Sequence, residues 1–263
     1  MLFAGVDVGS VAAKAVIFDA ERRSVVGQAV LPTGWNPKEA GSAALDAALR
    51  EAGASRSDPA RIVGTGYGRV SLPFAHKTVT EITCHAKGAA HLFPEARVVL
   101  DIGGQDSKVT RLNPDGSVAD FVMNDKCAAG TGRFLQVLAG ILDLSLSELS
   151  EAAAQGKPAP ISSMCAVFAE TEIVGLLAGG TPPEDIAAGV FLSVAKRMRA
   201  LARRIPFSGV CVFSGGTAVS PVFTRILEAE LETPVQIPEH PQTLGALGAA
   251  LCAVELGKKE INQ

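Results

Sequence analysis

The sequence has no apolar run long enough to cross a membrane. The apolar stretch at residues 244–254 is rich in glycine and alanine and falls short of the about 20 residues that a membrane-spanning helix needs. No basic segment precedes the first apolar residues, and Asp7 follows them too early for a secretory signal peptide. We therefore expect a cytoplasmic protein without a membrane segment.

Basic residues are too few and too dispersed for a nucleic-acid-binding surface. Lysine and arginine number 24 against 27 acidic residues, which gives a net charge of -3. The densest basic stretch, residues 196–204, has the pattern of the polar face of one helix. The 263 residues are 48% hydrophobic, which excludes disorder as the main state and suffices for one large core or two modest ones.

Cysteines are scarce and odd in number, and no two of them form a C-x-x-C pair. In a reducing compartment, five cysteines argue against a disulfide framework, so burial or metal binding must explain them. Cys211 lies in an apolar strand pattern and Cys252 in an apolar helix pattern, and both are interpreted as buried thiols. Cys84 is open to either interpretation.

One pattern occurs twice at matched spacing, in residues 6–18 and residues 100–112. Each copy has a short apolar strand ending in aspartate, a glycine-containing turn, a lysine seven positions after the aspartate and a second strand. A polar turn and a third apolar run follow, so each copy predicts a β-meander. Two copies at fixed spacing are stronger evidence than either alone.

The chemistry predicted for the repeated turns is phosphate binding. Glycine lets backbone N–H groups approach an anion, lysine neutralises charge, and a carboxylate at the same place requires Mg²⁺ between itself and a phosphate. For one copy alone, an ordinary hairpin with a surface aspartate is an equal alternative. The candidate residues are Asp7, Gly9, Ser10 and Lys14 in the first turn, and Asp101, Gly103 and Lys108 in the second.

The remaining pattern is a mixture of helices and strands. The glycine-rich segment 64–69 lacks the Gly-Lys-[Ser/Thr] ending of a Walker A loop and is weak evidence alone. A strand at 210–213 leads into Gly215 and Gly216, a junction that can admit an adenine ring or a ribose. Gln242 precedes a final helix whose small residues suit either close packing or approach to a nucleotide. Helices are expected at 37–53, from residue 81, and at 128–142, 146–155, 167–178, 184–204, 221–232 and 243–256.

Cys127 and Cys165 each precede a helical pattern. A helix N-terminus lowers the pKa of a thiol and favours a bound anion, and an iron–sulfur cluster with thiolate ligands is such an anion. A four-thiolate site would need two chains, since each supplies only these two cysteines. Inert buried thiols are the alternative.

Several segments resemble the activator ATPases of 2-hydroxyacyl-CoA dehydratases and the related ATPase subunits of benzoyl-CoA reductases. The resemblance covers nearly the whole chain. Two departures from the pattern, Val11 in the first turn and Thr217 after the glycine pair, remove no acidic group and no cluster ligand. The most specific segments are residues 101–108, 124–132 and 164–168, followed by 5–10, 64–69 and 81–86.

The resemblance implies an α/β, two-lobed actin-like ATPase fold of duplicated RNase H-like lobes. It implies a first lobe of residues 1–94, joined by a C-terminal helix at 243–263, and a second lobe of residues 95–242. It further implies a homodimer that holds one 4Fe-4S cluster through Cys127 and Cys165 of both subunits. ATP hydrolysis would drive a low-potential electron from a ferredoxin or flavodoxin to a partner CoA-ester dehydratase or reductase under anaerobic conditions.

The mechanism expected from this resemblance couples cleft closure to the cluster. ATP would contact Gly104 and Gln105 besides the turn residues above, with Asp7 and Asp101 holding Mg²⁺ or positioning water. Gln105 would orient the attacking water. Two alternatives stay open: a sugar or small-metabolite kinase of the same fold, with no role for the two cysteines, and a nucleotide-dependent scaffold without redox activity.

Overall fold

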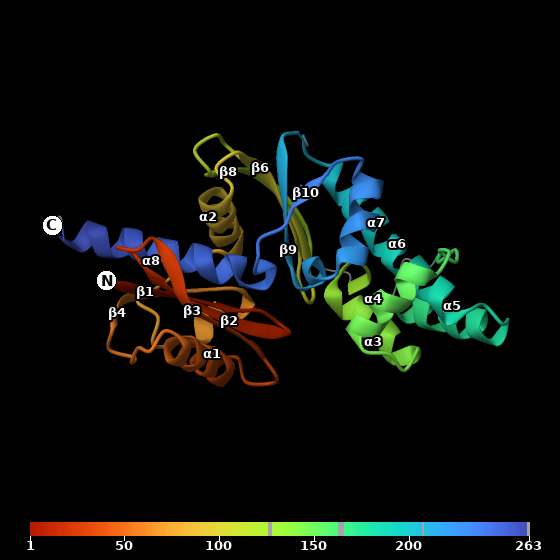
Figure 1. Cartoon of the computed structure of the whole chain (residues 1–263), viewed down its shortest axis with the longest axis horizontal. Coiled ribbons are helices and arrows are strands. Elements are labelled where there is room, and N and C mark those ends of the chain that lie inside the picture. Colours follow the sequence, from red (N-terminus) through yellow and green to blue (C-terminus); the bar gives the residue numbers. More distant parts are fainter. Residues whose placement is uncertain (126–127, 163–165, 207, 262–263) are drawn as a thin grey trace. The chain divides into compact units, whose positions relative to one another are not determined.

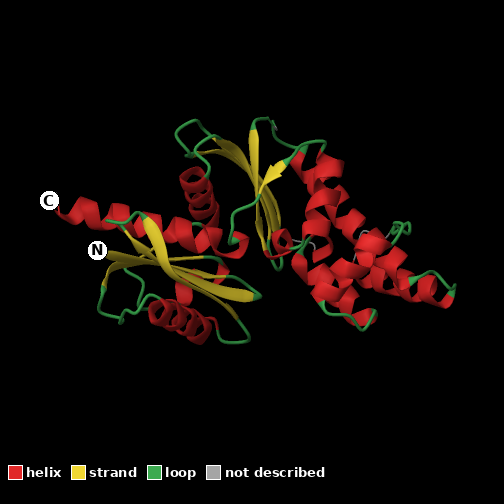
Figure 2. Ribbon diagram, in the orientation of Figure 1, coloured by secondary structure: helices red, strands yellow, loops and turns green. Residues whose placement is uncertain are grey.

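The structure is a computed structural model that describes residues 1–125, 128–162, 166–206 and 208–261. Its described residues form an α/β protein with two five-stranded sheets (Figures 1 and 2). The chain divides into two compact units. Unit 1 comprises Met1–Val99, Thr110–Asp120 and Pro238–Gln263, and unit 2 comprises Leu100–Val109 and Phe121–Ile237.

The first sheet contains the first predicted meander. Its strand order is β3-β2-β1-β4-β5. The pairs β1–β2 and β2–β3 are antiparallel, whereas β1–β4 and β4–β5 are parallel. The strands are β1 (Leu2–Val8), β2 (Ala12–Asp19), β3 (Ser24–Pro32), β4 (Pro59–Thr65) and β5 (Lys77–Thr78).

Helices cover both faces of this sheet (Figure 1). Val6 of β1 packs in a buried cluster with Leu45 of α1, whereas Phe3 packs on the other face with Ala249 of α8. Side chains alternate along a strand, so the odd-numbered residues of β1 face α8. Each fully buried side chain of this size stabilises the fold by about 1.5–3 kcal/mol. The helices are α1 (Pro37–Glu51), α2 (Glu81–Leu92) and α8 (Leu244–Ile261).

Glycines allow α8 to lie unusually close to its neighbours. A Cβ at Gly5 would collide with the Ala246 carbonyl oxygen, and one at Gly248 would collide with the Cys84 carbonyl oxygen. The small residues at the start of this helix therefore serve close packing against β1 and α2, which was one of the two interpretations of the sequence.

The second sheet contains the second predicted meander, in the order β10-β9-β6-β7-β8. The two-residue strand β10 pairs parallel to β9 and was not predicted, because two residues carry no periodic signal. The strands are β6 (Ala96–Ile102), β7 (Ser107–Leu112), β8 (Val118–Asn124), β9 (Val210–Gly215) and β10 (Val235–Gln236).

The helices of unit 2 follow the predicted ranges with one correction. The expected helix at 128–142 begins instead as a short 3-10 turn at Ala128–Gly130, and α3 starts only at Gly132. Phe223 lies in the core of the unit, edge-to-face with Phe191. The helices are α3 (Gly132–Ile141), α4 (Leu146–Gln155), α5 (Ala166–Ala178), α6 (Pro183–Ala202) and α7 (Pro221–Leu231).

Across the described residues, none of the helices combines the length and the apolar character needed to span a membrane.

Candidate functional site

The first predicted phosphate turn joins β1 to β2. The Gly9 N–H donates to the Ala12 carbonyl oxygen over 3.0 Å and closes the turn. Lys14 is the register partner of Asp7 across the two strands, and its Nζ lies 3.1 Å from Asp7 Oδ2. The Asp7 carboxylate is 1% exposed, so this ion pair holds a buried charge at the edge of the turn.

The second carboxylate oxygen of Asp7 is not part of the ion pair with Lys14. Its Oδ1 is buried and has no hydrogen-bond partner among the residues that the structure describes. Gly66, which has φ +86°, lies against this oxygen so closely that a Cβ there would collide with it. A buried carboxylate oxygen needs a partner, and Mg²⁺ with its bound waters is a suitable one. The residues present therefore fit a magnesium ion beside Asp7.

The second turn joins β6 to β7 and has the same geometry. The Gly103 N–H donates to the Asp106 carbonyl oxygen over 2.9 Å. Lys108 Nζ lies 3.5 Å from Asp101 Oδ2 and 2.8 Å from Asp106 Oδ2. Asp101 is buried and also accepts a hydrogen bond from the Ser214 hydroxyl at 3.2 Å. Ser214 could not be recognised as a site residue from the sequence, because its contact with Asp101 depends on the pairing of distant strands.

Within each unit, the structure brings together the aspartate, the turn glycine and the lysine that the repeat singled out. The other predicted turn residues lie at the surface of the turns. Gln105 is exposed, whereas Ser10 and Gly104 are half-buried. An exposed amide and a half-buried hydroxyl beside the backbone N–H groups of a turn can contact a phosphate or a water molecule.

The second turn is bonded directly to the start of α3. The Gly132 N–H donates to the Gly103 carbonyl oxygen and the Arg133 N–H donates to the Gly104 carbonyl oxygen, each over 2.8 Å. The Ser107 hydroxyl donates to the Gly130 carbonyl oxygen. This explains the late start of α3: its first amide groups have partners in the turn instead of in a preceding helical residue. The segment that follows residue 127 is thus fixed to the predicted phosphate site.

Gly215 and Gly216 lie in unit 2, whereas Gln242 lies in unit 1. Gly215 has φ +96°, and a Cβ there would collide with the Ile102 carbonyl oxygen and come within 2.9 Å of Asp101 Oδ1. Gly215 therefore allows β9 to approach the second turn, and Gly216 begins the 3-10 turn Gly216–Val219. Gln242 lies in unit 1, in the 3-10 turn Pro241–Thr243 that precedes α8.

The two candidate cluster ligands, Cys127 and Cys165, lie outside the described residues. Cys211 is buried as predicted, and burial raises the pKa of its thiol to about 12. Cys84 is fully buried, and contact with the Cys252 thiol together with burial raises the pKa of Cys84 above its usual range. Cys252 is only partly buried, against expectation, because its position on α8 lies beside charged side chains such as Lys87.

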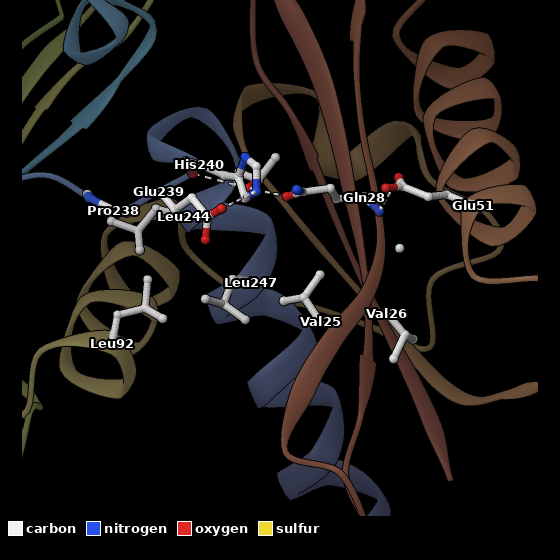
Figure 3. A pocket seen from close by; sticks show the side chains of 12 residues that line it. Val25, Val26, Gln28, Glu51, Leu92, Pro238, Glu239, His240, Leu244 and Leu247 are labelled. Atoms are coloured by element: carbon white, nitrogen blue, oxygen red, sulfur yellow. Dashed lines mark hydrogen bonds and ion pairs between the residues drawn. The ribbon is translucent and has the colours of Figure 1, made fainter. Parts of the chain in front are cut away.

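A separate pocket of about 420 Å³ lies in unit 1. The Thr243 hydroxyl donates to the Gln28 side-chain oxygen. The Gln28 backbone N–H donates to Glu51, and Figure 3 shows these two residues side by side. Gln28 pairs with Val16 of β2, toward the opposite end of that strand from the first turn. The pocket is therefore distinct from the phosphate-binding geometry. Its other lining residues include Val25, Leu92, His240, Leu244 and Leu247.

Known structures place this architecture among the actin-like ATPase folds. A ROK hexokinase from Thermus thermophilus superimposes with a TM-score of 0.54 at 17% identity, over 97% of this chain and 99% of that one, a likeness of fold alone. The chain matches the BadF/BadG/BcrA/BcrD ATPase family over residues 4–253, and it belongs to that family.

Two relatives are much more similar. An activator of lactoyl-CoA dehydratase from Anaerotignum propionicum is 44% identical over 257 residues, which are 97% of this chain and 98% of that protein. The solved activator of 2-hydroxyisocaproyl-CoA dehydratase from Clostridium difficile, with bound ADPNP, is 40% identical with a TM-score of 0.95, over 100% of this chain and 97% of that one. The resemblance drawn from the sequence motifs is confirmed.

Proposed function

We propose that the protein is an ATP-hydrolysing iron–sulfur activator that delivers a low-potential electron to a partner CoA-ester dehydratase or reductase. The observation that carries this proposal is the set of hydrogen bonds joining the second turn, at Gly103 and Gly104, to Gly132 and Arg133 at the start of α3. A change at the turn would be transmitted through these bonds to the part of the chain that follows Cys127. The similarity to two dehydratase activators supports the identity of the acceptor.

ATP hydrolysis is assigned to the two turns. Lys14 and Lys108 hold the carboxylates of Asp7 and Asp101 in place by buried ion pairs. Asp7 Oδ1 would hold Mg²⁺ through water bound to the ion, and the ion would supply charge neutralisation to the phosphates. Asp101 and the exposed Gln105 would position the attacking water.

Cys127 and Cys165 would hold a 4Fe-4S cluster, shared with the same two cysteines of a second chain in a homodimer. When bound, such a cluster stores one electron at a potential set by charge, hydrogen bonding and exposure. The places of the other three cysteines support this choice of ligands. Cys211 is buried in the core, and Cys84 is in contact with Cys252. The electron donor would be a ferredoxin or flavodoxin, and the cell compartment the cytoplasm.

The second turn would be coupled to the cluster ligands through the start of α3. Gly103 and Gly104 accept hydrogen bonds from its first amide groups, so a movement of the turn around ATP or ADP displaces the chain next to Cys127. Each about 59 mV of one-electron potential corresponds to a tenfold change in equilibrium. A nucleotide-dependent difference of a few kcal/mol would therefore shift electron transfer substantially.

The test is the iron and sulfide content of anaerobically purified protein, measured with its mass in solution. Cys127→Ala and Cys165→Ala should each lose iron and brown colour, whereas Cys211→Ala should keep both and lose only packing stability. ATP hydrolysis with electron transfer to an added CoA-ester dehydratase should require the wild-type cysteines. A monomer carrying four irons, or a colourless wild-type protein that phosphorylates a sugar, would contradict the proposal.

A further inference from the structure

Thr65 is a buried polar residue to which the nucleotide site as described assigns no role. It ends β4 and belongs to the glycine-rich segment 64–69. Its side chain is 0% exposed, and its Oγ1 has no hydrogen-bond partner within the described part of the chain. The Cys84 thiol lies beside it: contact with Cys252 raises the pKa of Cys84, and a smaller interaction with the Thr65 side chain lowers it. A thiol is a weak donor and acceptor, so it is a poor partner for the hydroxyl. A buried, unsatisfied hydroxyl costs about 1–3 kcal/mol, so the fold alone gives no reason for it.

The pairing of strands places Thr65 beside Asp7. The two residues are register partners in the parallel pair of β1 and β4. Partners in a parallel pair project from the same face of a sheet. Because side chains alternate along a strand, Phe3 lies on the same face as Asp7, and Val63 on the same face as Thr65. Phe3 and Val63 pack in one cluster with Ala249 of α8. The Thr65 hydroxyl and the Asp7 carboxylate therefore lie on the same face, at the ends of adjacent strands.

Both side chains present an unsatisfied oxygen on this face. Oγ1 of Thr65 and Oδ1 of Asp7 are buried without a hydrogen-bond partner among the described residues. Asp7 Oδ2 is already engaged by Lys14. Two such oxygens on neighbouring strands provide a carboxylate acceptor and a hydroxyl that can donate or accept, which is what one bound water molecule needs.

Two glycines border the same place. A Cβ at Gly66 would collide with Asp7 Oδ1, and a Cβ at Gly245 would lie 3.1 Å from Asp7 Oδ2 and 3.2 Å from His85 Nε2. Side chains are thus missing on two sides of the carboxylate. Gly66 lies in the loop after β4 and Gly245 at the start of α8, and both segments pack near β1. The space beside Asp7 is therefore bordered by backbone atoms.

We propose that the Thr65 hydroxyl and Asp7 Oδ1 bind one shared water molecule that belongs to the hydration shell of the divalent cation accompanying the nucleotide. Thr65 is then a positioning residue: it keeps the second Asp7 oxygen turned away from Lys14 and available to that shell. Mg²⁺ gives up its waters reluctantly and usually binds proteins through several of them. The inference rests on the proposed nucleotide function and assigns the glycine-rich segment a part in it.

The test compares Thr65→Val, which keeps the shape and removes the hydroxyl, with Thr65→Ser, which keeps the hydroxyl. The affinity for ADP is measured by titration calorimetry, once with Mg²⁺ and once with EDTA. In Thr65→Val, the increase in ADP affinity caused by Mg²⁺ should be about tenfold smaller than in the wild type, which is the value of one hydrogen bond to a charged site. The ADP affinity in EDTA should be unchanged. Thr65→Ser should stay within about twofold of wild type. The melting temperature of Thr65→Val should change little, because the interaction that it removes within the protein, with the Cys84 thiol, is a weak one.

Three results would overturn the inference. Thr65→Val could show the magnesium dependence of the wild type, or Thr65→Ser could be as impaired as Thr65→Val, which would make packing the cause. A wild-type protein whose ADP affinity does not respond to Mg²⁺ would overturn both this inference and the magnesium part of the proposed function, whereas the first two results leave that function intact. Should Thr65→Val fail to fold, Thr65→Ala removes the same hydroxyl and takes its place.

Discussion

Lys14 Nζ lies 3.1 Å from Asp7 Oδ2, and the two residues face each other across the antiparallel strands β1 and β2. Lys108 forms the corresponding ion pair with Asp101 in the second turn, at 3.5 Å, and adds a contact of 2.8 Å to Asp106. Each lysine therefore holds the carboxylate of its own turn. The repeated lysine is a structural part of the site as well as a source of positive charge for phosphate.

Lys108→Met should destabilise the protein strongly. The lysine side chain is 5% exposed and neutralises Asp101 and Asp106, so its loss leaves uncompensated buried charge. Removing one member of a buried ion pair costs about 3–5 kcal/mol. Urea unfolding measures the change. The exposed Lys38 provides the control, since Lys38→Met should shift the free energy of unfolding by no more than about 0.5 kcal/mol. Equal effects of the two variants would contradict the structural role of Lys108.

Gly66→Ala should abolish tight binding of MgATP. The new methyl group would collide with Asp7 Oδ1 and with the backbone carbonyl group of Val8, at a position with φ +86°. Gly53→Ala is the matched control, because Gly53 has φ +64° but nothing within 4 Å of a Cβ. Both variants bear the backbone strain of about 1–2 kcal/mol, and only Gly66→Ala disturbs the carboxylate. Nucleotide affinity measured by calorimetry should therefore separate them, and equal affinities would exclude the contact as the cause.

Asp101→Asn should stop ATP turnover while leaving the fold intact. The substitution keeps the shape and can still accept the Ser214 hydrogen bond, but it removes the charge that organises the cation or the attacking water. Loss of one such electrostatic group lowers the rate by about 100-fold or more. Phosphate release is the measurement. Glu151→Gln, on the exposed part of α4, should hydrolyse ATP at the wild-type rate. Full turnover in Asp101→Asn would remove this residue from the mechanism.

The stability of the protein should decline in acid partly through His91. Burial, assisted by Arg23, lowers the pKa of His91 below its usual value, and the ring packs edge-to-face on Phe18 with centroids 5.7 Å apart. The unfolded chain therefore takes up this proton at a higher pH than the folded one does. Stability from this group is fully present above about pH 6.5, the unfolded value, and is lost as the pH falls below it toward the folded pKa.

Urea unfolding of the wild type and His91→Gln between pH 7.5 and 5 tests this effect. The variant should show a shallower decrease of unfolding free energy with falling pH. Parallel curves for His91→Gln and the wild type would contradict the prediction.

Local signals in the sequence were sufficient for most elements. The two meanders follow from strand alternation and from the repeat itself. The predicted helix at 146–155 coincides with α4 because its start is set locally: Ser145 and Glu148 form a capping box. The aspartate, glycine and lysine of each turn could be named for the same reason, since all three belong to one hairpin.

Features that depend on distant segments could not be predicted. The helix expected from residue 128 starts at Gly132, because Gly103 and Gly104 bind its first amide groups. Thr65 acquires its place only when β4 pairs with β1, and threonine at the end of a strand carries no signal of an unsatisfied hydroxyl. The role of Gly215 likewise requires Ile102 from another strand.

The sheet of unit 1 is covered on one face by the last long helix of the chain. Phe3 and Val16, made early in translation, find part of their cover in Ala249 and Ala246 of α8. After the first segment of unit 1 ends at Val99, the ribosome must synthesise residues 100–243 before it reaches α8. At ~5–20 residues per second this takes about 7 to 29 seconds. Throughout that interval the nascent chain carries an apolar sheet face without its helix. Production of this protein in a foreign host should therefore depend on translation speed and on chaperones that bind unfinished sheets.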